Sequence, residues 1–88
     1  GAGARALLRH DERRAQVQAL ARSCATMNDE RRITLAQAVR CKQVTDQSFV
    51  AIDVARGAYG AGDLTKAQGQ LELARTLLLE AERIVGAK

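Results

Sequence analysis

Cys24, Cys41 and His10 carry the side chains best suited to covalent or metal chemistry in this chain. Two cysteines and one histidine fall short of the four ligands that a structural zinc site needs, and the cysteine spacing matches no metal motif. His10 precedes Cys24 by 14 residues, which is roughly 21 Å along a continuous helix, so the two cannot form a catalytic dyad within it. We therefore predict no metal site and no cofactor.

Other residues with catalytic potential lack a supporting context. Ser23 and Ser48 have no neighbouring base in the sequence, and the glycine-rich stretch 57–62 lacks the lysine and the preceding strand of a phosphate-binding loop. Asp53 interrupts an apolar run, where it either points to solvent beside Arg56 or is a buried partner for an arginine of the first helix. We expect no catalytic residues and no enzymatic activity.

Positive charge is concentrated in the first half of the chain. Residues 1–44 hold nine Arg or Lys against four Asp or Glu, whereas residues 45–88 hold five against six. Arg5, Arg9 and Arg13 recur every four residues, so they share one side of a helix, and Arg14 adds to that charge. Such a face binds phosphates through counterion release. An anion-binding or nucleic-acid-binding module is therefore the alternative hypothesis for function.

The composition predicts an all-α chain. Proline is absent, and Ala, Leu, Arg, Gln and Glu, which favour helices, are abundant. No run approaches the roughly 18 apolar residues that a membrane span needs. We expect a soluble, single helical domain over residues 1–88, with the cytoplasm slightly favoured and the compartment otherwise unknown.

Residues 64–85 give the clearest helical pattern. Asp63 is a good N-cap, and Gly60 and Gly62 before it mark a turn. Leu or Val alternates with Ala at spacings of three and four, which predicts a core stripe that allows a neighbouring helix to approach closely. The stripe comprises Leu64, Ala67, Leu71, Ala74, Leu78, Ala81 and Val85.

Two further helices are expected at about 5–27 and 34–58. Thr34 and Gln37 have the form of a capping box at the start of the second helix. Residues 49–54 are apolar almost all round, as in a central helix. The short connections predict a three-helix, up-down-up antiparallel bundle. The alternative is a hairpin of the first two helices, with the third helix docking on a second subunit.

The two cysteines fall on expected core faces. If the first connection turns at residue 30 or 31, Cys24 lies beside residue 37, and Cys41 lies roughly 6 Å further along the helix. Together with the separation of the helices, this exceeds the Cα distance of approximately 7 Å that a disulfide tolerates. This register argues against a cross-link, although a turn centred at 32 or 33 would permit one.

Residues 48–81 resemble a tetratricopeptide-type helical hairpin. The resemblance rests on Ala55, Ala58 and Tyr59 in the first helix, on the turn 62–64, and on small and apolar positions of the second helix, namely Ala67, Leu71 and Ala74. It covers about two fifths of the chain, lacks the closing proline and has no second copy. It implies a helical hairpin of a kind used for protein contacts, without the concave groove of repeat arrays.

Leu73, Leu77 and Ile84 form a second apolar strip on the third helix, roughly 100° from the core stripe. The polar first half of the first helix cannot cover this strip, and an uncovered leucine strip usually marks an interface. We therefore expect a non-catalytic helical protein-interaction module, which either self-associates as a homodimer or binds a partner helix through these three residues. Nucleic acid is the less favoured partner.

Overall fold

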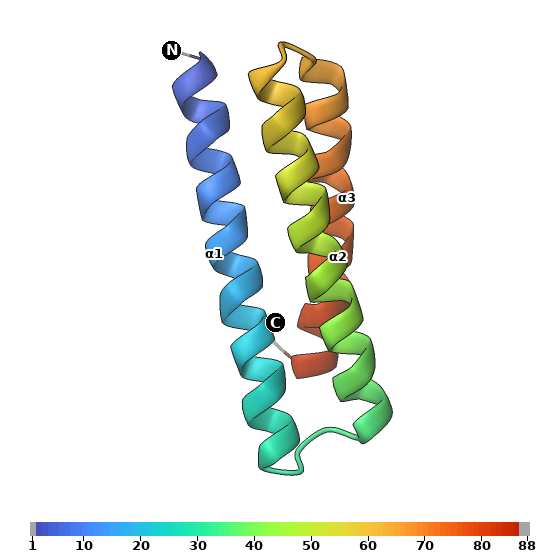
Figure 1. Ribbon diagram of the computed structural model, residues 1–88. Helices are drawn as coiled ribbons and strands as arrows, with labels where there is room; N and C mark the ends of the chain where they lie inside the picture. Colours follow the sequence, from blue (N-terminus) through green and yellow to red (C-terminus); the bar gives the residue numbers. More distant parts are fainter. Residues whose placement is uncertain (1, 87–88) are drawn as a thin grey trace.

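The computed structural model describes the backbone of residues 2–86 and the side chains of residues 11–86. Three helices make up this part of the chain, namely α1 (Ala2–Asp29), α2 (Leu35–Gly60) and α3 (Leu64–Val85). They lie side by side and alternate in direction, so the expected all-α, up-down-up bundle is confirmed (Figure 1). α3 packs on α2 of its own chain, and the alternative in which it docks only on a second subunit is wrong.

Local signals set the starts of α2 and α3. The Thr34 hydroxyl accepts a hydrogen bond of 3.1 Å from the backbone N–H of Gln37, and the Gln37 side chain accepts one of 2.8 Å from the Thr34 N–H. This reciprocal pair is the capping box expected from the sequence. At the start of α3, the Asp63 side chain alone forms the cap, accepting a hydrogen bond of 3.1 Å from the Lys66 N–H. Both caps satisfy N–H groups that have no partner within the helix.

The seam between α2 and α3 is filled mainly by small side chains. Ala51, Ala55 and Ala58 are buried in α2, and the alanines expected on the core stripe of α3 are buried as well: Ala67, Ala74 and Ala81. Ala74 packs in one cluster with Ala51, whereas Ala81 packs with Cys41 and Val44. Leu64, at the head of the same stripe, is 55 % exposed, so its expected place in the core is wrong. It begins α3 directly after the turn, beyond the last buried alanines of α2 and α3.

α1 packs less extensively on the other two helices than these pack on each other. Val17 is fully buried, and it joins Ile52 and Leu78 in one apolar cluster. Arg14 donates a hydrogen bond of 2.7 Å to Asp53, and its guanidinium lies 5.4 Å from the centre of the Phe49 ring. An arginine of α1 is thus the partner of Asp53, as one of the two sequence interpretations held, but the carboxylate is exposed rather than buried.

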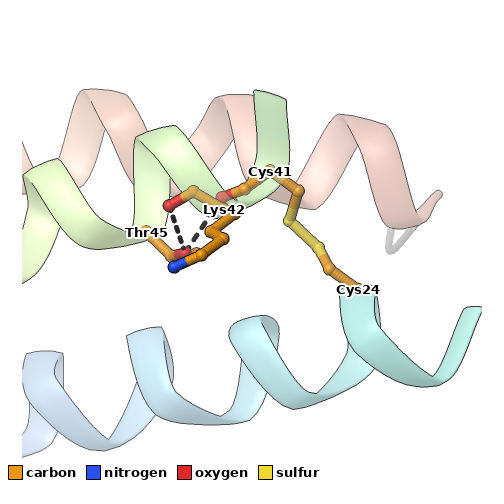
Figure 2. Close-up of a disulfide and its surroundings, with 4 residues drawn as sticks. All are labelled: Cys24, Cys41, Lys42 and Thr45. Carbon is orange, nitrogen blue, oxygen red and sulfur yellow. Dashed lines mark hydrogen bonds between the residues drawn. A yellow bond between two sulfur atoms is a disulfide. The ribbon is translucent and has the colours of Figure 1, made fainter. Parts of the chain in front are cut away.

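A disulfide joins Cys24 of α1 to Cys41 of α2, with the Cα atoms 6.4 Å apart (Figure 2). The register expected from the sequence was wrong, because it placed the turn at residue 30 or 31. α1 continues to Asp29, Arg31 takes a left-handed backbone conformation (φ 58°), and α2 begins at Leu35. The connection is therefore centred near residue 32, which places the two cysteines opposite each other. Both are buried beside Val44 and Ala81.

The disulfide is expected to contribute substantially to the stability of the domain. It closes a loop with a sequence separation of 17 residues, and loop-entropy estimates for such a loop give about 3 kcal/mol. Reduction should lower the free energy of unfolding by an amount of this order, as measured by urea denaturation with and without a reductant. Because reduction leaves both cysteine side chains in place, this comparison tests the cross-link more directly than a substitution does. The variant with Cys24→Ala and Cys41→Ala should show no response to reductant; equal midpoints for the oxidised and reduced native chain would contradict the expectation.

Candidate interaction face

Large apolar side chains remain exposed along the outward side of α2. Leu35, Val39, Val50 and Val54 lie within about 100° of one another around the helix axis. Of the two valines near the middle of α2, Val50 is more exposed than Val54, at 63 %. This side of α2 was not identified from the sequence, because residues 49–54, which are apolar on all sides of the helix, were interpreted as buried on all sides. A three-helix bundle covers only part of a helix surface, so apolar residues on all sides also indicate that the outer side is exposed.

A groove of about 380 Å³ runs between α2 and α3 beside these valines. Its apolar wall comes from Val50 and Ala51 on α2 and from Leu73 and Leu77 on α3, and its other lining residues are Asp46, Gln47 and Gln70. We define the α2–α3 face as this groove together with Val54. Apart from Asp46, which is paired with Lys42 at 3.1 Å, the groove carries no charged side chain among its lining residues. Such depletion of charge is typical of the centre of a protein interface.

The structure separates the three leucine and isoleucine residues that were predicted to bind a partner. Leu73 is 47 % exposed and lines the groove. Leu77 is half-buried: it lines the groove and also packs on the cluster around the disulfide. Ile84 is half-buried against that same cluster and is not among the residues that line the groove. Of the predicted strip, Leu73 and Leu77 therefore line an exposed groove, whereas Ile84 partly covers the core.

Two glycines continue the α2–α3 face toward the turn between the helices. Gly57 follows Val50 by two helical turns, and Gly69 precedes Leu73 by about one turn, so each lies on the same side of its helix as the apolar residue. Neither has a positive φ, and a Cβ atom at either position would meet nothing within 4 Å. Glycine in a helix interior costs about 1 kcal/mol relative to alanine. Packing within the described chain does not account for this cost.

A bidentate ion pair crosses the seam one turn beyond Leu77. Arg40 of α2 donates to both carboxylate oxygens of Glu80 on α3, at 2.8 and 3.0 Å. These hydrogen bonds lower the pKa of the Glu80 carboxyl, and the nearby positive charge of Arg83 acts in the same direction. At the other end of the face, Lys66 makes no ion pair with any described residue.

The structure describes the side chains of only some of the arginines that the alternative hypothesis, anion or nucleic-acid binding, requires. The side chains of Arg5 and Arg9 lie outside the described residues. Arg13 donates to Gln16 at 3.0 Å, and Arg14 is held by Asp53 and Phe49. The structure thus gives Arg14 a role in attaching α1 to α2, and it leaves anion binding by this group of arginines as an untested prediction.

A second hollow, of about 390 Å³, lies between α1 and α3 and includes Arg22 and Arg32 in its lining. It also contains Ser23, Thr26 and Val85, close to where both helices end. The C-terminal ends of helices carry partial negative charge, which disfavours an anion there. This hollow is therefore a poorer candidate site than the α2–α3 face.

No other chemistry emerges from the described residues. The Ser48 hydroxyl is fully buried and donates to the Val44 carbonyl at 2.7 Å, and the Thr45 hydroxyl lies within hydrogen-bond distance of the Cys41 and Lys42 carbonyls (Figure 2). Within the described part of the chain, no three His, Cys, Asp or Glu side chains gather as a metal site. None of the described helices combines the length and the apolar character required to cross a bilayer.

The stability of the seam should depend on pH through Glu80. Its pKa is lower in the folded chain than when unpaired, so the ion pair stabilises the fold above the unfolded pKa, and this contribution is lost as the pH falls through the folded value. Glu80→Gln should therefore lower the thermal midpoint slightly at pH 7 and leave it unchanged in strong acid. Glu72→Gln, at an exposed glutamate of α3 without an ion pair among the described residues, is the matched control. An equal effect of Glu80→Gln at both pH values would refute this account.

In comparisons with known proteins, no family model, no curated protein and no solved structure matches this chain. Residues 48–81 do lie in a helical hairpin, made by the second half of α2 and most of α3. The resemblance to a tetratricopeptide-type hairpin remains a likeness of pattern and assigns no family.

Proposed function

We propose that this chain is a non-catalytic helical module that binds protein, either a second copy of itself or a helix of a partner, through the α2–α3 face. The observation that carries the proposal is the pair Val50 and Leu73, large apolar residues that are 63 % and 47 % exposed on the two sides of one groove. Exposed apolar surface that is grouped around a groove and bordered by polar residues is a common mark of a binding site for protein.

The small residues of the face support the same proposal. Gly57 and Gly69 leave open space that the described chain does not use, and small residues on a helix surface allow another backbone to approach closely. Burying Leu73 and Val50 against a partner would remove apolar area from water, at roughly 25 cal/mol for each Å². The partner would thereby offset part of the cost of exposed leucine, valine and helical glycine.

Leu73→Glu should abolish protein binding while leaving the fold intact. A charge in the centre of a desolvated contact costs several kcal/mol, whereas at an exposed helical position it disturbs the monomer little. Leu79→Glu is the matched control, because Leu79 is 45 % exposed on another side of α3. Binding would be followed by light scattering for self-association and by cross-linking for other partners, with circular dichroism to verify folding. Equal binding by both variants would contradict the proposal.

The disulfide also bears on where the module works. Disulfides persist in oxidising surroundings, such as the bacterial periplasm or the extracellular space, and are rare in the cytosol. We propose an oxidising compartment, in place of the cytoplasm that the sequence slightly favoured, and the burial of both cysteines beside each other supports this. Thiol labelling of the protein in denaturant, directly after rapid acid quenching of its source cells, should find both cysteines blocked. Free Cys24 and Cys41 would refute the proposal.

A further inference from the structure

We propose that the partner of the α2–α3 face is a second copy of this chain, with the two α3 helices packed antiparallel about a two-fold axis at Leu73. In this arrangement, Leu77 of each copy occupies the open space over Gly69 of the other, and Lys66 of each copy faces Glu80 of the other. The inference rests on the proposed function and names its partner.

The sequence positions on α3 are symmetric about Leu73. Gly69 precedes it and Leu77 follows it by four residues, and Lys66 and Glu80 lie seven residues away on either side. Four and seven residues are close to one and two turns, so all five positions fall on one side of the helix, with Lys66 and Glu80 each about 10 Å from the centre. A two-fold interface requires that if residue i contacts residue j, then j also contacts i. An antiparallel pair centred at Leu73 satisfies this requirement at every one of these positions.

The shapes of the paired positions are complementary. Gly69 is exposed, and a Cβ atom there would meet nothing within 4 Å. Leu77 lines the groove one turn after Leu73, whereas Gly69 lies one turn before it. A large side chain opposite a missing one allows two helices to interdigitate closely. Val50, across the groove from Leu73, would flank the contact from α2.

The charges select the antiparallel orientation. Lys66 has no ion-pair partner among the described residues. Arg40 occupies one site on each Glu80 oxygen, and a carboxylate oxygen can accept a second hydrogen bond. In a parallel pair, Lys66 would face Lys66 and Glu80 would face Glu80, which is unfavourable. In the antiparallel pair, Lys66 of each copy meets Glu80 of the other beside Arg40, and the remaining acceptor capacity of the Glu80 carboxylate receives the lysine.

The lining of the groove, which is neutral apart from Asp46, is consistent with burial in such a contact. Gln47 and Gln70 line the groove, and Gly57 extends the outer side of α2 with the same open space as Gly69. Neutral side chains here can form hydrogen bonds without the desolvation cost of buried ions. Val39 and Leu35, further along α2, lie on the same side of that helix and would be covered by the flank of the second copy only if the helices cross at a shallow angle.

The test measures the dimer dissociation constant by sedimentation velocity over a range of protein concentrations, using the whole chain with its disulfide intact. Lys66→Glu should raise this constant roughly tenfold or more, because it places like charges opposite each other twice. Arg75→Glu makes the same change of charge on the α1 side of α3 and should leave the constant unchanged. Gly69→Leu should also weaken the dimer, and because its side chain has open space in the monomer, the fold should melt no earlier than the native chain.

Disulfide cross-linking at Leu73 tests the position of the two-fold axis directly. Leu73→Cys should form a disulfide-linked dimer under mild oxidation, since a residue on the axis meets its own copy. Leu79→Cys, at a similarly exposed leucine away from the face, should not.

The outcomes separate this inference from the proposed function. A chain that stays monomeric, yet holds another protein in a way that Leu73→Glu abolishes, would overturn the two-fold dimer and leave the binding face in place. A dimer that is indifferent to Lys66→Glu and Gly69→Leu would overturn the antiparallel geometry. A monomer without any Leu73-dependent partner would overturn both.

Discussion

Small side chains are buried on both helices of the hairpin, namely Ala51, Ala55 and Ala58 on α2 and Ala67, Ala74 and Ala81 on α3. Because their side chains are so small, they permit a close approach of the backbones. The remaining large side chains are thereby divided between the two sides of the seam. Ile52 and Leu78 face α1 and form the core with Val17, whereas Val50 and Leu73 fall on the opposite side and line the groove. The location of the core and the location of the groove thus have the same cause.

α1 depends on specific links as well as on packing. Among the described side chains of α1, few of the large ones are fully buried, because residues 11–14 are acidic residues and arginines where a dry core would need leucine or valine. The disulfide to α2 and the contact of Arg14 with Asp53 and Phe49 lie more than two turns apart along α1. The exposed ion pair alone contributes little. The covalent link is therefore the stronger of the two attachments of α1 to the hairpin of α2 and α3.

The surface that we propose for protein contacts lies on the hairpin of α2 and α3. On α3 the exposed Leu73 lies between Gly69, above which the space is open, and the half-buried Leu77. Lys66 and Glu80, which carry opposite charges, lie at the two ends of this segment. Such a pattern is wasteful in an isolated monomer, since each exposed apolar residue and each helical glycine costs stability. In the proposed dimer, a second copy of the same surface would cover both the exposed leucine and the open space at the glycine.

Much of the fold followed from the sequence by itself, because the relevant signals are local. Helix propensity, the Thr34 capping box and the Asp63 cap depend on residues within one turn of each other, and they predicted the helices and their order. The heptad of α3 predicted the buried alanines, and the second apolar strip on the same helix predicted the exposure of Leu73. Tertiary structure decided the rest. The pairing of Cys24 with Cys41 turned on the backbone of Arg31, a shift of one or two residues that no pattern specified. The exposure of Leu64 and Val50, and the half-burial of Ile84, depended on which other parts of the chain pack over each of these residues. Burial is a property of what covers a residue from distant parts of the chain, and sequence spacing describes only the helix on which the residue lies.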